Sequence, residues 1–261
     1  MSMDEEDWIR LLQHVSEFAA TVPGGTRRTL REFQQLAGWV NWSFNVFPGP
    51  ARPLLKPALS NVYAKIGGKK ETHAKIFVNK AVVRDLHWFS SHVRQSDGIY
   101  LFEDVDWDKE RADVIAYSDA CLSGLGFYFE RSKEGFQCLV PDQAPKDTIF
   151  YFEALAVVSV VDAVTRLAVV PSRLLVYSDN TNTVDIFHSL RSLPAYNDLL
   201  KFTISLLIKH DISLRVVHVP GVDNSVADSL SRFENTKAVA ECPGLSISSF
   251  QPPRVALGLE F

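Results

Sequence analysis

Two segments of the chain repeat one pattern, an apolar run that ends in Tyr-Ser-Asp, at residues 114–119 and 174–179. Short apolar runs rich in β-formers predict strands that are buried on both faces. Sites in open α/β sheets form at the carboxyl ends of such strands. If the two strands lie side by side, Asp119 and Asp179 bring two carboxylates close together. Taken alone, each aspartate is also compatible with a turn or a helix cap.

Two further acids stand in positions that could add to such a site. Glu153 lies near the start of an almost wholly apolar helix predicted over 150–169, where an uncompensated buried carboxylate would be costly. Asp228 lies in a short helix predicted over 224–232, on a different side from the inward-facing Val226 and Leu230. Alone, Glu153 could simply favour the helix dipole, and Asp228 could be a solvated surface acid. Their order with Asp119 and Asp179 is the specific feature.

The surrounding elements predict how these acids are positioned. Residues 1–96 show helical spacing of apolar residues and predict a small all-helical subdomain, with the second helix beginning at Thr29. Residues 97–111, with their acidic run, predict a linker. Residues 112–232 predict three strands, a helix, a strand, two helices, a strand and a helix, which is a mixed α/β domain with a five-stranded sheet. Residues 233–261 are rich in Pro, Ser and Gly and predict a poorly structured tail.

Four motifs in this α/β segment resemble the signature regions of the ribonuclease H domain of retrotransposon reverse transcriptases. They are Tyr-Ser-Asp-Ala at 117–120, Phe-Glu-Ala-Leu-Ala at 152–156, Tyr-Ser-Asp-Asn at 177–180 and His-Val-Pro-Gly-x-Asp-Asn-x-x-Ala-Asp-x-Leu-Ser-Arg at 218–232. The last motif is the most specific, because packing alone gives little reason for it. The resemblance implies a ribonuclease H-like sheet flanked by helices, with Asp119, Glu153, Asp179 and Asp228 as the metal-binding and catalytic quartet.

The resemblance also implies the chemistry and the partners. Carboxylates are hard oxygen ligands that suit Mg²⁺ or Mn²⁺, and two ions are expected to clamp the scissile phosphate. The expected substrate is the RNA strand of an RNA–DNA hybrid, recognised by shape, 2′-hydroxyls and phosphates. Ser123, Asn180 and Asn182 are expected to contact this nucleic acid. The residues between Pro220 and Asp228 hold no histidine, although cellular ribonucleases H often have one there, and His218 is interpreted as structural.

The helical part resembles the segment between polymerase and ribonuclease H in these elements. Residues 30–42, 52–55 and 84–89 carry this similarity, which is closest in character to fungal elements of the tyrosine-recombinase, DIRS-like type. No Asp-Asp dipeptide occurs in the chain, so the Tyr-x-Asp-Asp polymerase motif of the family is absent. The chain is therefore expected to be a fragment of a polyprotein that acts with, or apart from, a polymerase domain or subunit.

Composition sets the outer limits of the interpretation. The chain has 261 residues, 46% of them hydrophobic, and a net charge of −4, so nucleic acid would have to be held by local patches or metal ions. The three cysteines, Cys121, Cys138 and Cys242, form no disulfide framework or zinc motif. The acidic N-terminus and the absence of a long apolar span predict an intracellular, cytoplasmic or nuclear protein without membrane contact.

Three alternatives remain open at the level of sequence. A domesticated or decaying remnant could keep the fold as a silent nucleic-acid-binding or structural module. A transposase or integrase of the same broad fold would place a glutamate last in the series, whereas here Asp228 is last. A nucleotide-binding ATPase of related topology is disfavoured because no P-loop is present.

Overall fold

The computed structural model describes residues 5–20, 22, 25–46, 55–95, 107–145 and 148–257. The chain divides into two compact units, one formed by Met1–Glu103 with Leu190–Asn197, the other by Asp104–Ser189 with Asp198–Phe261. The first unit therefore includes a short segment from within the predicted 112–232 domain. In the described part of the chain, no helix is both long and apolar enough to cross a membrane.

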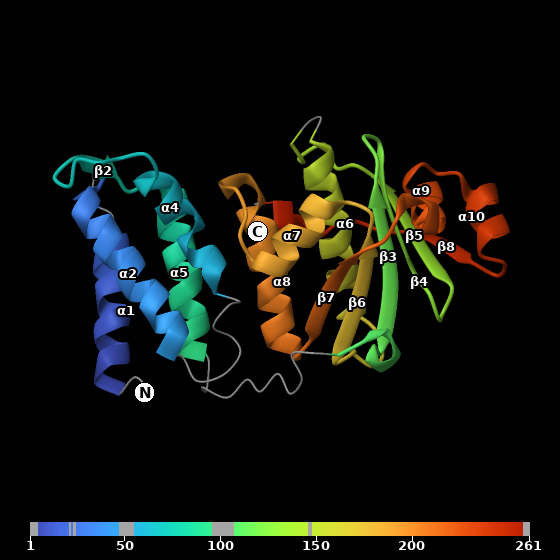
Figure 1. The fold of residues 1–261 in the computed structure, drawn as a ribbon, viewed down its shortest axis with the longest axis horizontal. Helices are drawn as coiled ribbons and strands as arrows, with labels where there is room; N and C mark the ends of the chain where they lie inside the picture. Colours follow the sequence, from blue (N-terminus) through green and yellow to red (C-terminus); the bar gives the residue numbers. More distant parts are fainter. Residues whose placement is uncertain are drawn as a thin grey trace. The chain divides into compact units, whose positions relative to one another are not determined.

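The first unit is a helical bundle with one small sheet (Figure 1). Its elements are α1 (Glu5–Ala19), β1 (Arg27–Thr29), α2 (Leu30–Val46), η1 (Lys56–Leu59), α4 (Ser60–Ile66), β2 (Lys75–Phe77), α5 (Lys80–Gln95) and the 3-10 turn η3 (Pro194–Tyr196). The predicted inward face of α2, from Leu30 to Phe44, is buried. The predicted start of that helix is also confirmed: the Glu32 carboxylate accepts the backbone N–H of Thr29, and the Thr29 hydroxyl accepts the N–H of Glu32.

Two features of this unit differ from the sequence prediction. The antiparallel pair β1–β2 was not expected, since strands of three residues are too short to show a period of two. The third predicted helix, over 52–66, is a 3-10 turn followed by α4 in its described part, and residues 52–54 lie outside the described residues. The predicted helix stops at 23–25 and 47–50 also lie largely outside them.

The second unit is a six-stranded mixed sheet flanked by helices, which confirms the predicted fold class. Its elements are η2 (Lys109–Arg111), β3 (Val114–Ala120), β4 (Gly124–Phe129), β5 (Glu134–Leu139), α6 (Ile149–Val164), β6 (Arg173–Ser178), α7 (Thr181–Ser189), α8 (Asn197–His210), β7 (Ser213–His218), η4 (Gly221–Asp223), α9 (Ser225–Ser231), α10 (Asn235–Glu241), β8 (Ser246–Ser249) and η5 (Arg254–Leu257). The strand order is β7-β6-β3-β4-β5-β8. Figure 1 shows α6, α7 and α8 on one side of the sheet and α9 and α10 on the other.

The strand directions place the ends of β3 and β6 together. Strands β3, β4 and β5 form an antiparallel meander, while β6 runs parallel to β3 and β7 runs parallel to β6. Helix α6 packs against the central strands, and thirteen of its side chains are buried. This arrangement is the one that the resemblance to ribonuclease H implies, and it fixes the carboxyl ends of β3 and β6 at one edge of a rigid sheet.

The prediction of a five-stranded sheet and an unstructured tail over 233–261 was wrong. Residues 235–241 form α10, and residues 246–249 form β8, which pairs in parallel with β5 as a sixth strand. The C-terminal segment also reaches the core, since the Phe250 ring packs edge-on against Phe127. The strand Ser-Ile-Ser-Ser carries a single apolar residue, and it is held by pairing with β5 and by packing of Ile247 against the cluster that contains Leu230 and Leu245.

The predicted linker over 97–111 is described only from Trp107 onward. There it is part of the second unit, because Trp107 packs with Ile115 and Leu175 on the sheet. The indole Nε1 donates to Ser213 Oγ at 3.0 Å. Asp106 and Asp108 flank this tryptophan, so the acidic run around it conceals the anchor in the sequence.

Candidate metal centre at the strand ends

Asp119 and Asp179 lie at the ends of neighbouring parallel strands, as the repeated Tyr-Ser-Asp pattern predicts. Asp119 is the penultimate residue of β3, and Asp179 directly follows β6. The register pairs Tyr117 with Tyr177, so the two aspartates are equally far beyond the paired tyrosines. Because both side chains come from strand ends, their positions are fixed by the ladder hydrogen bonds rather than by a loop.

Glu153 brings a third carboxylate to this point from α6. One carboxylate oxygen from each of Asp119, Glu153 and Asp179 lies within 4.8 Å of the others. Asp119 is 4% exposed and Glu153 is 5% exposed. Glu153 Oε2 is buried with no hydrogen-bond partner, although leaving a buried acceptor unsatisfied costs about 1–3 kcal/mol. Three converging acids with an unsatisfied oxygen form an arrangement that suits a divalent cation.

Burial and mutual repulsion weaken the acidity of all three groups. Burial, and then the charges of Asp119 and Asp179, raise the pKa of Glu153 to about 9. Burial raises the pKa of Asp119 to about 7, although the Ser231 hydroxyl opposes the rise, and the charge of Asp179 adds to it. Burial also raises the pKa of Asp179, with Asp228 contributing. A divalent cation would reverse these effects, since it stabilises the ionised form of every carboxylate it contacts.

Asp228 lies near the cluster but is not one of the three converging acids. It projects from α9, and its charge raises the pKa of both Asp119 and Asp179. Its Oδ1 accepts a hydrogen bond from Nε of Arg232 at 2.7 Å, one helical turn further on. The structure thus brings three members of the predicted quartet together and ties the fourth to a cation.

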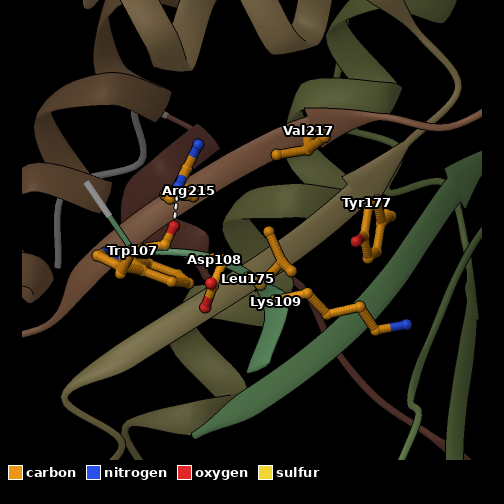
Figure 2. A pocket seen from close by; sticks show the side chains of 7 residues that line it. All are labelled: Trp107, Asp108, Lys109, Leu175, Tyr177, Arg215 and Val217. Carbon is orange, nitrogen blue, oxygen red and sulfur yellow. Dashed lines mark hydrogen bonds between the residues drawn. The ribbon is translucent and has the colours of Figure 1, made fainter. Parts of the chain in front are cut away.

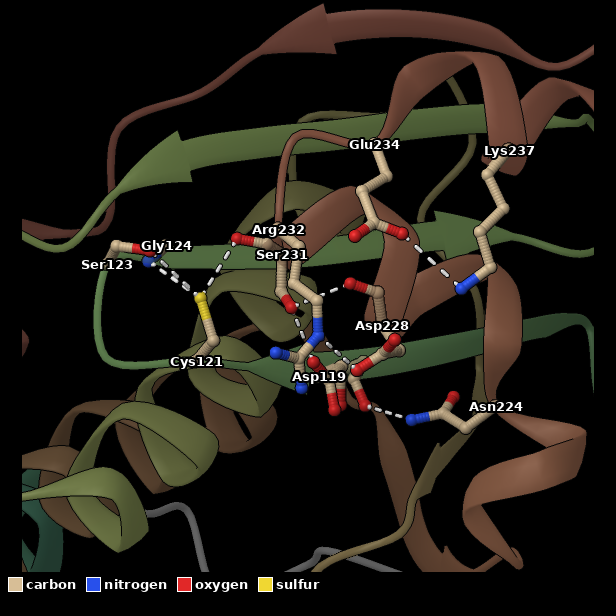
Figure 3. A network of polar contacts seen from close by, with 11 residues as sticks. Asp119, Cys121, Ser123, Gly124, Asn224, Asp228, Ser231, Arg232, Glu234 and Lys237 are labelled. Carbon is tan, nitrogen blue, oxygen red and sulfur yellow. Dashed lines mark hydrogen bonds and ion pairs between the residues drawn. The ribbon is translucent and has the colours of Figure 1, made fainter.

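Helix α9 reaches the end of β3 because two glycines on β4 let it approach (Figure 3). A Cβ at Gly126 would lie 2.4 Å from the backbone nitrogen of Ser231, and one at Gly124 would lie 2.2 Å from its carbonyl oxygen. The Ser231 hydroxyl donates to Asp119 Oδ2 at 2.6 Å. The Asn224 Nδ2 donates to the carbonyl of Ser118 at 3.0 Å. These contacts hold α9, and with it Asp228, beside the strand end.

The predicted nucleic-acid-binding residues have different surroundings. Ser123 is exposed, in the turn between β3 and β4, with its hydroxyl 3.2 Å from the sulfur of Cys121. Asn180 Oδ1 accepts the backbone N–H of Thr183 at 3.0 Å, so this side chain caps α7. Asn182 is exposed on the first turn of α7. The helix cap considered for Asp179 is therefore made by Asn180, which leaves the Asp179 carboxylate to the acid cluster.

Several residues of the site were not predicted from the sequence. Ser231, Arg232 and Asn224 contact the cluster or its supporting strand. All three belong to the motif at 218–232, but no role at the site was predicted for them. His218, interpreted as structural, is exposed at the end of β7, and its charge lowers the pKa of Asp179. A Cβ on Gly221 would lie 3.2 Å from Asp179 Oδ2, so the Pro220-Gly221 turn lies directly beside that carboxylate. The His-Val-Pro-Gly string was the available signal.

A concavity of about 510 Å³ lies elsewhere on the sheet and contains no comparable cluster (Figure 2). It is lined by Trp107, Asp108, Lys109, Leu175, Tyr177, Arg215 and Val217. The Arg215 guanidinium donates to the carbonyl of Trp107 and lies 5.4 Å from the centre of its ring. Lys109 Nζ is 3.0 Å from the carboxylate of Glu130. The cations of this pocket are engaged by neighbouring protein groups, and they anchor the segment that begins at Trp107.

The residues of the acid cluster fit a magnesium or manganese ion. Every converging side chain offers carboxylate oxygen, which these hard cations prefer over the nitrogen and sulfur ligands typical of zinc. The three cysteines are free, and none belongs to the cluster. The unsatisfied Glu153 Oε2 supplies a buried acceptor for such an ion.

No protein-family model matches the chain, and neither does a curated protein. Solved structures do match. Two of them are ribonucleases H. LC11-RNase H1, in a complex with an RNA/DNA hybrid, is 17% identical with a TM-score of 0.39, covering 45% of this chain and 92% of that one. RNase H1 of the halophilic archaeon Halobacterium salinarum NRC-1 is 16% identical with a TM-score of 0.39, covering 49% and 98%.

A larger protein matches across both units. The foamy viral protease-reverse transcriptase, in a complex with an RNA/DNA hybrid, is 14% identical with a TM-score of 0.29, covering 82% of this chain and 27% of that one. All these TM-scores and identities are low, so the function has to be inferred from the residues of the site.

Proposed function

We propose that the chain is a metal-dependent endonuclease that cleaves the RNA strand of RNA–DNA hybrids. The observation that carries this proposal is the convergence of Asp119 and Asp179, at the ends of two parallel strands, with Glu153 from α6, where Asp119 and Glu153 are buried. A protein gains no stability from such a group of like charges, so the arrangement is better explained by chemistry than by packing. The order of the acids and the motif at 218–232 direct the proposal to ribonuclease H chemistry.

Each acid has a role that follows from its position. Asp119 and Asp179 are the central ligands, because they stand on the rigid strand ends, and Glu153 closes the group from α6. Asp228 completes the shell from α9. Two bound Mg²⁺ or Mn²⁺ ions would supply an activated water and stabilise the leaving 3′ oxygen. Ser231 fixes Asp119 by donating to Oδ2.

Recognition of the hybrid is proposed to be local, since the net charge of −4 provides no general attraction for a polyanion. Ser123 and Asn182 are exposed near the strand ends and offer hydroxyl and amide groups to phosphates and 2′-hydroxyls. The side-chain amide of Asn180 can add a donor, since its Oδ1 already caps α7. We further propose that the chain is a fragment of a DIRS-like retrotransposon polyprotein, with 1–96 as its thumb- or connection-like part, acting in the cytoplasm or nucleus with or without a polymerase.

The test is cleavage of a labelled RNA–DNA hybrid by the full chain with Mg²⁺ or Mn²⁺. Single-stranded RNA and a chelator serve as controls, and Asp179→Asn is compared with Asp185→Asn, which makes the same charge change on an exposed turn of α7. We expect cleavage of the hybrid RNA only, lost in Asp179→Asn and retained in Asp185→Asn. Absence of cleavage by the folded chain with either metal would contradict the proposal and favour the catalytically silent remnant.

A further inference from the structure

Asp228 and Arg232 form a pair whose exposure allows it to open. The two residues stand one turn apart at the end of α9, with Nε of Arg232 2.7 Å from Oδ1 of Asp228. The Arg232 side chain is 52% exposed and that of Asp228 is 31% exposed. Exposed ion pairs of this kind are weak, so the competing attraction of a divalent cation for the Asp228 carboxylate can displace the guanidinium.

The backbone beneath this pair is held firmly while the side chains are not. Leu230 is fully buried, and Ser231 is tied to Asp119 and closely packed on Gly126. Opening the pair therefore requires only rotation of the two side chains and no movement of α9. Figure 3 shows the guanidinium beside both Asp119 and Asp228, and its charge acts on both Asp119 and Asp179.

We infer that Arg232 holds the place of a second cation at Asp228, and that on loading of the site it leaves Asp228 to contact a phosphate of the nucleic acid. This inference rests on the proposed function. Asp119, Glu153 and Asp179 suffice to hold a first ion. A second ion needs the Asp228 carboxylate, to which Arg232 donates. A guanidinium released at that point stands at the rim of the site, where its planar fork suits a phosphate.

The inference makes metal binding and substrate binding respond in opposite directions to loss of Arg232. In Arg232→Ala, the affinity for the first ion is expected to change less than the affinity for the second, which should bind on the order of two- to tenfold more tightly. The KM for the hybrid is expected to rise several-fold, and the slope of log KM against log salt to fall by about one, because one phosphate contact is lost. Arg232→Lys keeps the charge but not the planar fork of donors. Its ion affinity and its KM should lie between those of the unchanged chain and those of Arg232→Ala.

The experiment measures Mn²⁺ binding to the full chain without nucleic acid, by calorimetry and by electron paramagnetic resonance. Lys237→Ala is the matched control, since Lys237 pairs with Glu234 in a similarly exposed contact on the next helix and its loss changes the net charge equally. We expect tighter binding of the second ion in Arg232→Ala and no change in Lys237→Ala. Circular dichroism establishes that each variant is folded.

Two outcomes would overturn the inference, and they are distinguishable from failure of the proposed function. Equal or weaker binding of the second ion in Arg232→Ala, with Arg232→Lys behaving in the same way, shows that Arg232 does not compete at Asp228. An unchanged KM for the hybrid in Arg232→Ala would show that Arg232 makes no contact with a phosphate of the nucleic acid. If the unchanged chain and every variant bind no divalent ion, the proposed metal centre itself is wrong.

Discussion

Charged groups are paired in one polar region of the sheet and are left as converging like charges in another. In the pocket around Trp107, Lys109 is paired with Glu130, and Arg215 donates to a backbone carbonyl. At the ends of β3 and β6, three carboxylates converge, and Glu153 Oε2 is buried without a hydrogen-bond partner. Satisfied polar groups rigidify a fold, whereas unsatisfied like charges destabilise it and persist where chemistry requires them. We therefore propose a structural role for the first region and a chemical role for the second.

Replacing Trp107 with alanine should show that the pocket region serves stability. The indole is 3% exposed, donates to Ser213 and lies beside Arg215, so its removal leaves a large cavity. We expect a loss of about 3–5 kcal/mol in the free energy of unfolding, measured by urea denaturation. Trp39→Ala, at a half-exposed tryptophan on α2, should cost far less.

Cleavage by the folded fraction of Trp107→Ala should be unchanged, because Trp107 belongs to the hydrophobic cluster with Ile115 and Leu175 rather than to the acid cluster. If Trp107→Ala instead lowers the activity per folded molecule and leaves the free energy of unfolding unchanged, the pocket takes part in function and is not merely structural.

The acid cluster should give the metal-free protein an unusual dependence of stability on pH. The folded pKa of Glu153, about 9, and that of Asp119, about 7, lie above their ordinary values of 4.5 and 3.8. At pH values between the ordinary and the folded pKa of each group, the folded state therefore binds more protons than the unfolded state. Stability is lost as pH rises through this window. From pH 4.5 to pH 9 we expect the free energy of unfolding of the metal-free chain to fall by several kcal/mol.

Excess Mg²⁺ should reverse this trend, because a cation favours the ionised carboxylates and binds more tightly as they lose their protons. The measurement is the unfolding free energy at several pH values with Mg²⁺ or with a chelator. Parallel curves under the two conditions would show that no ion binds at these acids.

Glu153→Gln should separate stability from activity at a single residue. At pH 8 the Glu153 carboxyl, whose pKa is about 9 in the folded state, is mostly protonated in the fold but ionised in the unfolded chain, and this difference costs stability. A neutral glutamine removes that cost, so the metal-free protein should gain about 1–3 kcal/mol at pH 8, although Mg²⁺ should no longer add as much stability. Cleavage should fall at least about 100-fold, since even residues that only support metal ligands are commonly worth about 10–100-fold. Thermal unfolding and hybrid cleavage on the same preparations test both effects. A variant that is less stable at pH 8 without metal would contradict the assignment of Glu153 as a strained group.

Of the two regions, the acid cluster is the one that the sequence predicts better. Asp119 and Asp179 are visible because each ends a short apolar run, and runs of that kind are strands in a parallel sheet. Glu153 is visible because it interrupts an otherwise apolar helix. The convergence of Asp119 and Asp179 follows from the rule that the carboxyl ends of neighbouring parallel strands share an edge, whereas Glu153 was joined to them by the order of the acids and the resemblance.

The parts that the sequence does not predict depend on contacts between distant segments. Ser231 and Asp119 are joined by a hydrogen bond across 112 positions, and no local pattern marks a serine for that role. The strand Ser246–Ser249 has too few apolar residues to show alternation, and it depends on the open edge of β5 and on the cluster that Ile247 contacts. Trp107 lies in an acidic context that suggests a linker, and its burial is decided by the sheet it meets.

The smallest expected effect comes from Lys109→Ala, and it sharpens the comparison because the pair it breaks resembles that of Arg232. Lys109 and Glu130 are 43% and 34% exposed and 3.0 Å apart, close to the exposure of the Arg232–Asp228 pair. Exposed pairs of this geometry contribute about 0–1 kcal/mol, so Lys109→Ala should lower stability by no more than that. A double-mutant cycle with Glu130→Ala measures the coupling. Divalent-ion binding should stay unchanged in Lys109→Ala, although the variant loses the same charge as Arg232→Ala. If both variants alter ion binding equally, the effect at Arg232 comes from the loss of one positive charge anywhere on the unit. If only Arg232→Ala alters it, the position of the Arg232–Asp228 pair beside the acids gives that pair a function, and the Lys109–Glu130 pair is structural.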